Sequence, residues 1–401
     1  MPFEIPENWC WVTGNDIFNA MISCKPQGDE FKYIDIDSID NKNHRIISPK
    51  ILKVKNAPSR ASRYTQPGDV LFSMVRPYLK NIALVEEGSC IASTGFFVCS
   101  PMQLLTSEYC YYMMLSDYVI YGLNQYMKGD NSPSINNGHI TSWLYPIPPI
   151  NEQLRISAEI KKWFVFIDDL ERGKIELESL IKQVKSTILD FAISGKLVPQ
   201  DPNDESAIEL LKRINPDFQP CDNSHYENLP QGWTIVGLHS VAEIITGSTP
   251  SKMNAEYYNG DVPFYKPNDL DQGRHVRCAS EYLSQQGKSI SRSIPCNSIA
   301  VCCIGSIGKC GFIEKEGVTN QQINTIVPND AIFPLYMYYF CNSSTFIDEL
   351  KSLSSAVTIS IVNKSKLSTI QIPLPPIAEQ KRIISVIEKL YSHLDMITAE
   401  L

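Results

Sequence analysis

Residues 147–153 read IPPINEQ and residues 374–380 read LPPIAEQ, so one short phrase occurs twice in the chain. Each copy leads into a segment that stays in register with the other, with Arg155 matching Arg382 and Ile160 matching Ile387. A repeat of this length predicts two similar domains, each followed by a similar helix. Two readers held at a fixed separation suit a ligand with two separated half-sites, and DNA is the obvious candidate.

The repeat extends beyond the proline phrases. Each half opens alike, with IPENW at 5–9 and LPQGW at 229–233, and PGDVLF at 67–72 aligns more loosely with PCNSIA at 295–300. We therefore expect a first domain, a central helix, a linker with one short helix at 206–214, a second domain and a C-terminal helix. The expected bounds are 1–146, 147–198, 199–228, 229–373 and 374–401, respectively.

Both large segments are expected to be rich in strands. Short apolar runs bounded by Gly, Pro, Asn and Ser are typical of strands in a buried sheet. Helices are expected to be few, with 107–121 and 334–350 the better candidates, so each segment reads as a β-rich α+β domain. The apolar runs lie at 70–75, 82–85, 95–98, 299–304 and 323–327.

After Pro149 the pattern changes, because apolar residues recur at spacings of three and four for about five heptads. This pattern predicts a long coiled-coil helix, and some 40 residues would span roughly 60 Å. Gly195 is expected to end it as a C-cap. The second copy repeats the seam over a shorter length, so we expect the two helices to pair antiparallel. The seam residues are Ile156, Ile160, Trp163, Ile167 and Leu170, with Ile383, Ile387, Leu390, Leu394 and Ile397 in the second copy.

Composition is that of a soluble globular protein of two to three domains. No apolar run reaches the ~18 residues of a membrane span, and no signal peptide is visible at the start. The 12 cysteines form no C-x-x-C pair. This pattern favours free thiols in a reducing cytoplasm over zinc or disulfides, and no membrane partner is expected.

The net charge of −8 seems unfavourable for DNA binding, but the acidic residues lie mainly in the central connector. Residues 42–80 hold nine basic side chains against one acid, and residues 266–309 hold six against three. Local basic patches of this kind are what a phosphate backbone requires. The alternative for each patch is an ordinary solvated surface.

Basic, amide and aromatic residues cluster in the turn-rich stretches. Arginine reads guanine edges, Asn and Gln read adenine, and Lys or Ser hold phosphate; the alternative is loop solvation or a network that caps strands. The candidate DNA-binding residues are Arg60, Arg63, Tyr64, Arg76, Tyr78, Lys80 and Asn81, then Lys266, Asn268, Ser306, Lys309, Asn320, Gln321, Gln322 and Asn324.

The sequence contains no recognisable catalytic motif. Neither Pro-Pro pair has the flanking Asn or Asp and aromatic residue of an amino-methyltransferase, and GSIGKC at 305–310 lacks the spacing of a phosphate-binding P-loop. Asp330 with 349–351 resembles a nuclease carboxylate cluster by spacing alone. We therefore predict no catalytic residues and no metal ligands on this chain, with a nuclease as the rival from another class.

The chain resembles the specificity subunit of type I restriction–modification systems. Besides the two proline phrases and their helices, the resemblance rests on FAISGKLVPQ at 191–200, LPQGW at 229–233, GSIG at 305–308 and TNQQ at 319–322. The match covers essentially the whole chain. The duplicated order of domain and helix is far more specific than any single motif.

The resemblance implies that residues 1–146 and 229–373 are target recognition domains, each reading one half of a bipartite, asymmetric site on double-stranded DNA. The paired helices would set the unread spacer and dock two methylation subunits, which carry S-adenosylmethionine. Two restriction subunits, which use ATP and Mg, would complete the nuclease, and this chain would carry no cofactor and no active site. A specificity subunit of a type IIB-like enzyme, or less readily a protein scaffold, remains open.

Two departures from the family pattern are visible. The GSIG turn of the second half corresponds to RPYL at 76–79 in the first, so contact roles at these positions are not interchangeable. The C-terminal helix is much shorter than the central one.

Overall fold

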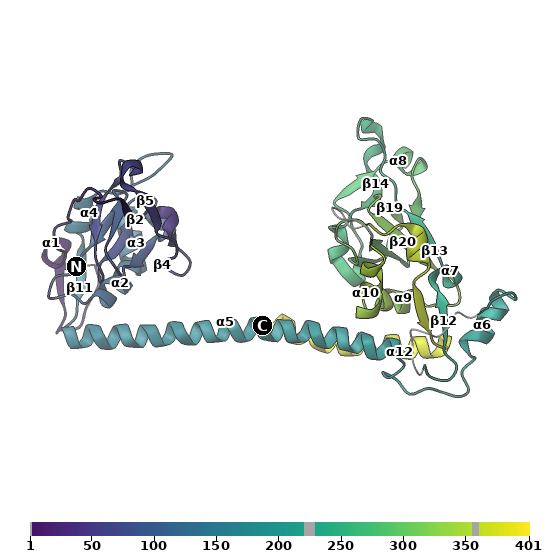
Figure 1. The fold of residues 1–401 in the computed structure, drawn as a ribbon. Coiled ribbons are helices and arrows are strands. Elements are labelled where there is room, and N and C mark those ends of the chain that lie inside the picture. The colour runs from purple at the N-terminus through teal and green to yellow at the C-terminus, as the bar shows by residue number, and fades with distance from the viewer. Residues whose placement is uncertain (1, 220–228, 355–360) are drawn as a thin grey trace. The chain divides into compact units, whose positions relative to one another are not determined.

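The computed structural model describes residues 2–219, 229–354 and 361–401 (Figure 1). The chain divides into two compact units, Met1–Glu171 and Arg172–Leu401. Each unit is built from β-sheets with helices packed against them, and one long helix, α5 (Ile150–Ile193), passes from the first unit into the second. The fold is thus mixed α/β with a long helix.

Unit 1 contains two main sheets and two short strand pairs, β3–β4 and a pair that closes the domain. Strand β1 pairs antiparallel with β11, which directly precedes α5. One sheet has the order β10-β7-β8 and the other has the order β5-β2-β9-β6, in which β2 and β9 are parallel. The strands are β1 (Cys10–Thr13), β2 (Glu30–Ile34), β3 (Ile39–Asp40), β4 (Arg45–Ile46), β5 (Lys50–Lys53), β6 (Ala61–Thr65), β7 (Val70–Ser73), β8 (Ile82–Leu84), β9 (Cys90–Ser93), β10 (Phe96–Cys99) and β11 (Leu144–Ile147).

Unit 2 has the same kinds of pairing. Strand β12 pairs antiparallel with β21, which precedes the last helix. The two four-stranded sheets have the orders β13-β20-β17-β18 and β15-β14-β19-β16, with β14 and β19 parallel. The strands are β12 (Thr234–Gly237), β13 (Ala242–Thr246), β14 (Tyr258–Tyr265), β15 (Glu281–Leu283), β16 (Ser293–Ile294), β17 (Ser298–Cys302), β18 (Cys310–Ile313), β19 (Gly317–Thr319), β20 (Ile323–Pro328) and β21 (Gln371–Leu374).

The apolar runs at 70–75, 82–85, 95–98, 299–304 and 323–327 are confirmed as strands β7, β8, β10, β17 and β20. The two helices expected at 107–121 and 334–350 are each divided into two. Ser116 ends α2 (Ser107–Leu115) and caps α3 (Asp117–Asn124) by accepting from the Val119 N–H. Asn342 ends α9 (Pro334–Cys341), and the next residue, Ser343, caps α10 (Ser344–Ser352) by accepting from the Phe346 N–H. A serine hydroxyl at an N-cap satisfies a free N–H, which makes the break favourable.

The short helices are mostly capped by side chains. The expected helix at 206–214 is confirmed as α6 (Ala207–Ile214), with Ser206 and Glu209 forming a capping box. The remaining short α-helices are α1 (Gly14–Ile17), α4 (Asn137–Ser142), α7 (Leu238–Val241), α8 (Gln285–Ser289) and α11 (Lys364–Ser368).

The end of α5 confirms the role expected of Gly195. This residue has φ +70°, its N–H donates to the Ala192 carbonyl, and the Lys196 N–H donates to the Phe191 carbonyl at 2.9 Å. These two bonds define a Schellman motif, which favours glycine because of its left-handed backbone.

The segment after α5 is not a free linker. Val198, Leu210, Leu211 and Phe218 are buried in the main core of unit 2. The stretch expected as a linker with one short helix thus packs part of its length into this core, because these apolar side chains gain more from burial than from solvation. Residues 220–228 lie outside the described residues.

Helix α12 (Ile377–Glu400) packs antiparallel against the second half of α5 within unit 2 (Figure 1). Ile383 and Ile387 share the core with Ile188 near the end of α5. Farther along α12, the Tyr391 hydroxyl donates to the Lys185 carbonyl at 2.9 Å. The C-terminal part of α12 thus lies closer to the start of α5 than its N-terminal part does, so the two helices run antiparallel.

Candidate nucleic-acid interface

Three loops of unit 2 come together where strands of its two sheets end. We call them the unit 2 loop cluster, which consists of residues 247–249, 304–309 and 320–322. The Ser248 N–H donates to the Thr319 carbonyl at 2.9 Å, and the Cys303 N–H donates to the Gln322 carbonyl at 2.8 Å. These bonds tie the end of β13 and the β17–β18 loop to the β19–β20 loop.

Gly247 permits the closest approach within the cluster. A β-carbon at this position would lie 2.1 Å from the Asn320 carbonyl oxygen and 2.5 Å from the Thr319 carbonyl oxygen. Both neighbours are backbone atoms, which cannot rotate away as the end of a flexible side chain can. The sequence interpretation did not select residues 247–249, although GSTP at 247–250 after a strand is a turn signal.

Amide and hydroxyl side chains of the cluster hold one another in place. Asn320 Nδ2 donates to Gln322 Oε1 at 2.9 Å, and Thr249 Oγ1 donates to Gln321 Oε1. Asn320 is buried, whereas Gln321 and Ser306 are exposed. The cluster thus presents polar groups to solvent on a support fixed by internal hydrogen bonds, which suits recognition of base edges.

The two lysines of unit 2 that were predicted to bind DNA form ion pairs with acidic side chains. Lys266 Nζ lies 2.5 Å from Glu281, and Lys309 Nζ lies 2.7 Å from Asp271. Ion pairs in partly exposed positions contribute only about 0–1 kcal/mol, so a phosphate can replace the carboxylate at low cost. Arg292, which the sequence analysis did not select, donates to the Thr246 carbonyl at 2.9 Å beside the cluster.

Three of the predicted contact residues, Asn81, Asn320 and Asn324, are buried instead. Asn324 is 4% exposed, accepts from Thr246 Oγ1 at 2.8 Å and donates to the Val362 carbonyl. Asn81 is 5% exposed, between β7 and β8. Their expected role as surface contacts is therefore corrected to a structural one. Asn268 stays exposed, just before the 3₁₀ helix η5 (Asp269–His275).

In unit 1 the corresponding loop between β7 and β8, residues 76–80, surrounds the 3₁₀ helix η3 (Pro77–Leu79), and we call it the η3 loop. Arg76 and Lys80 at its two ends have φ of 48° and 53°. Tyr78 at its centre is 45% exposed. The structure thus places three of the predicted residues, all at least partly exposed, together in one turn.

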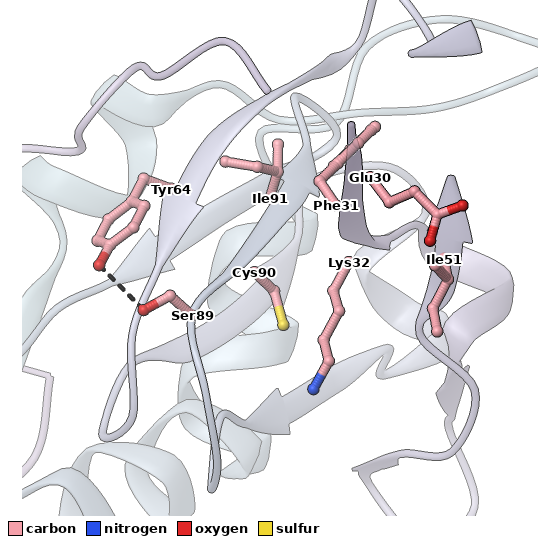
Figure 2. Close-up of a pocket in the computed structure, with 8 residues that line it drawn as sticks. All are labelled: Glu30, Phe31, Lys32, Ile51, Tyr64, Ser89, Cys90 and Ile91. Carbon is pink, nitrogen blue, oxygen red and sulfur yellow. Dashed lines mark hydrogen bonds between the residues drawn. The ribbon is translucent and has the colours of Figure 1, made fainter. Parts of the chain in front are cut away.

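Arg60, Arg63 and Tyr64 lie elsewhere in unit 1, on or beside β6 of the four-stranded sheet. Tyr64 lines a pocket of about 450 Å³ (Figure 2), where its hydroxyl is 3.1 Å from Ser89 Oγ. Glu30 and Lys32 both line this pocket among apolar side chains, so its charge is mixed. The other lining residues are Phe31, Ile51, Cys90 and Ile91.

The first proline phrase joins α5 to the domain of unit 1 through Gln153, whose side chain is fully buried. Its Nε2 donates to the carbonyls of Leu104 and Pro148 at 2.9 Å each, and its Oε1 accepts from the Thr106 N–H at 2.8 Å. One amide therefore satisfies three backbone groups, two of which lie in the loop before α2.

The second proline phrase makes the same set of bonds in unit 2. Gln380 Nε2 donates to the carbonyls of Ala331 and Pro375 at 3.2 and 3.0 Å, and its Oε1 accepts from the Phe333 N–H at 2.7 Å. Gln380 is also fully buried. The glutamine of each phrase thus fixes how the following helix meets the loop before α2 or α9.

The glutamates of the phrases bind the tryptophans that open each domain. Trp9 Nε1 donates to Glu152 at 3.1 Å, and Trp233 Nε1 donates to Glu379 at 2.9 Å. Glu379 is 1% exposed and also accepts from Gln200 Nε2 at 3.0 Å. Burial raises the pKa of the Glu379 carboxyl above its ordinary value, although these hydrogen bonds act against the shift.

This raised pKa predicts a pH dependence of stability. The folded protein holds the Glu379 proton more tightly than the unfolded chain does, so stability falls as pH rises from about 4.5 through the folded-state pKa. Glu379→Gln is expected to remove that part of the slope, as measured by urea unfolding at several pH values above 4. The same change at Glu152, which also accepts from a tryptophan, controls for replacing the carboxylate by an amide at this contact. An unchanged slope in Glu379→Gln would contradict the assignment.

The expected seam residues differ in how deeply they are buried. In unit 1, Ile156 packs against the core, whereas Trp163, Ile167 and Leu170 are 58%, 45% and 58% exposed. Ile160 is half-buried. In unit 2, Ile383 and Ile387 are buried, Leu390 and Leu394 pack partly against the core, and Ile397 is 44% exposed. The pairing of the five α5 seam residues, Ile156 to Leu170, with a second helix stays a prediction.

Among the described residues, no group of three or more His, Cys, Asp or Glu side chains is arranged to hold a metal ion. The helices in the described ranges also include none with the length and hydropathy of a membrane span. The cysteines described outside 220–228 and 355–360 are all free thiols.

Comparison with known proteins identifies the class. Residues 230–401, which include the unit 2 loop cluster and α12, match the family model described as type I restriction modification DNA specificity domain. The type I restriction enzyme HindI specificity subunit of Haemophilus influenzae is 26% identical, with 89% of this chain and 88% of that protein covered. The EcoEI specificity subunit of Escherichia coli is 24% identical over 100% of this chain and 80% of that protein.

The fold agrees with these matches. A chain from a solved structure described as the structural basis of complex assembly and conformational transition of the type I R-M system superimposes with a TM-score of 0.74 at 24% identity, covering 100% of this chain and 94% of that one. The resemblance found in the sequence is confirmed: residues 230–401 belong to the type I restriction modification DNA specificity domain family, and the chain is similar to type I specificity subunits over most of its length.

Proposed function

We propose that this chain is the sequence-specific DNA-recognition subunit of a type I restriction–modification complex and reads a bipartite, asymmetric site on double-stranded DNA. The observation that carries the proposal is the unit 2 loop cluster, which lies inside the matched specificity domain. Exposed Gln321 and Ser306 stand on a hydrogen-bonded support there, beside lysines whose ion pairs are weak. Such a surface can read base edges and hold phosphates.

We further propose that the two units are repeated recognition domains. Each has a closing strand pair, β1–β11 or β12–β21, that leads into a long helix. Each has a parallel strand pair within a four-stranded sheet, and each has a buried glutamine with three equivalent backbone partners. The second unit would read one half-site and the first unit the other.

The helices would set the spacing between the half-sites. Helix α5 has 44 residues, which corresponds to roughly 66 Å at 1.5 Å per residue. Half-sites on one face of DNA are separated by about 34 Å or a multiple of it. The antiparallel packing of α12 on the end of α5 supports a coiled coil that stiffens this spacer.

The exposed apolar residues of α5 would dock the partner subunits. Trp163, Phe166, Ile167 and Leu170 are each 45–58% exposed on one stretch of helix, which is unusual for a solvated surface. We propose that two methylation subunits, which bind S-adenosylmethionine, cover this region and join two restriction subunits, which use ATP and Mg. This chain would carry no cofactor or catalytic group and would act in the cytoplasm.

The test is a methylation map. The chain is expressed with the methylation subunits encoded beside it, and methylated adenines are located across the genome of the host. Methylation at one two-part sequence with a constant spacer is expected, and it should disappear when this chain is omitted. Scattered methylation without a two-part motif would contradict the proposal. Double-strand cleavage on both sides of the site would instead assign a type IIB-like enzyme, and cleavage by the isolated chain with Mg would assign a nuclease.

A further inference from the structure

Strained backbone is concentrated around the η3 loop of unit 1. The non-glycine residues with positive φ in the described chain are His44, Arg76, Lys80, Asn259 and Asn297. Three of the five belong here, since His44 Nδ1 donates to the Lys80 carbonyl at 3.1 Å. Arginine and lysine in the left-handed region cost about 1–2 kcal/mol each, and such strain clusters where a protein holds a group in place for binding.

Neighbouring segments hold the loop in this conformation. The Arg76 N–H donates to the Pro133 carbonyl at 2.8 Å, and Arg76 Nη2 donates to the Asn131 carbonyl at 2.7 Å. On the other side, Asn41 Nδ2 donates to the Leu79 carbonyl at 3.0 Å. The turn is therefore preorganised by bonds from two other loops.

The large side chains exposed at the centre of this loop are apolar. Tyr78 and Leu79 are 45% and 40% exposed, while Pro77 beneath them is buried. Arg76 and Lys80 flank the pair in the chain, Lys80 Nζ lies 3.0 Å from Asp117 in a partly exposed ion pair, and Lys42 is exposed next to Asn41. A rigid apolar tip among cations is suited to a polyanion whose interior is apolar, which describes duplex DNA.

The matching loop of unit 2 has a different chemistry. Its left-handed positions are Gly305 and Gly308, which adopt this backbone without strain. Ser306 occupies the tip, and Ile307 packs against the core of unit 2. Unit 2 thus has no exposed apolar pair at this position.

We infer that Tyr78 and Leu79 pack directly against apolar surfaces of the bases in the half-site read by unit 1. The surface is the C5 methyl of thymine in the groove or the face of a base that the tip unstacks. This inference rests on the proposed function. It assigns different recognition chemistry to the two half-sites, with apolar contact in one and hydrogen bonding in the other.

The experiment uses the full chain in complex with its methylation subunits and a duplex carrying the two-part sequence obtained from the methylation map. Tyr78→Ala and Leu79→Ala are each expected to weaken binding roughly tenfold or more, with Tyr78→Phe close to wild type. Leu104→Ala is the control, because Leu104 is 61% exposed on the same unit but lies outside the η3 loop. Thermal melting checks that all variants are folded.

Two modified duplexes identify the surface contacted. Uracil in place of thymine removes the methyl group, and 2-aminopurine fluoresces more strongly when it is unstacked. One of these effects is expected in one half-site only, and it should be lost in the alanine variants. Affinity within twofold of wild type for both alanine variants, or a Tyr78→Phe as weak as Tyr78→Ala, would overturn the inference while leaving the proposed function intact. A wild-type complex that shows no preference for the two-part site would contradict both the inference and the proposed function.

Discussion

Gln380→Ala is expected to lower the free energy of unfolding by about 3 kcal/mol or more. The change leaves the Phe333 N–H and the carbonyls of Ala331 and Pro375 without their partner in a buried joint. Each buried polar group left unsatisfied costs about 1–3 kcal/mol, and the empty volume of the side chain adds to this. Urea unfolding of the full chain measures the loss.

Gln183→Ala is the matched control, because Gln183 is exposed on α5 and alanine is a good helix former. We expect that variant to stay within about 0.5 kcal/mol of wild type. Gln153→Ala in unit 1 should be as damaging as Gln380→Ala, since Gln153 has the same three kinds of partner. A loss below about 1 kcal/mol for Gln380→Ala would mean that water or a shifted backbone replaces the amide.

Gly247→Ala is expected to abolish recognition of the half-site read by unit 2. The new methyl group would lie 2.1 Å from the Asn320 carbonyl oxygen, so β13 and the β19–β20 loop must separate. Separation breaks the bond from the Ser248 N–H to the Thr319 carbonyl and releases the support of Gln321. Forced overpacking of this kind costs about 1–3 kcal/mol, so the variant should fold but lose methylation at the two-part site.

Gly173→Ala provides the control for this change. No atom lies within 4 Å of the position that its β-carbon would take, and it is in the middle of α5. That variant should retain methylation and gain about 0.5–1 kcal/mol of stability from helix propensity. If Gly247→Ala also retains full methylation and stability, the loop cluster is not the rigid support described above.

The sequence was most informative where structure follows from local pattern. The 3–4 spacing of apolar residues after Pro149 and the position of Gly195 predicted α5 and its end closely. Short apolar runs between turn residues predicted the strands. The limit of this reasoning is visible at Ser116 and Ser343, where a hydroxyl that can cap a helix divides what the apolar pattern presented as one.

The candidate site was only partly predictable, because burial and contacts between distant residues cannot be read from a local sequence pattern. Asn81, Asn320 and Asn324 carry the same amide as the exposed Asn268, and nothing local shows that those three are buried. Gly247 gains its importance from a loop more than 70 positions away. Leu79 was not selected because its exposure depends on hydrogen bonds from other segments to the η3 loop.

By itself, the sequence determined that two similar phrases precede two helices, that each half is rich in strands and that the chain resembles type I specificity subunits. These are properties of composition, spacing and repetition along the chain. Only the tertiary structure decided that Gln153 and Gln380 fix the joints, that Gly247 closes the loop cluster and that Tyr78 projects from a strained turn. Those features consist of contacts between residues far apart in sequence, which exist only after the chain has folded.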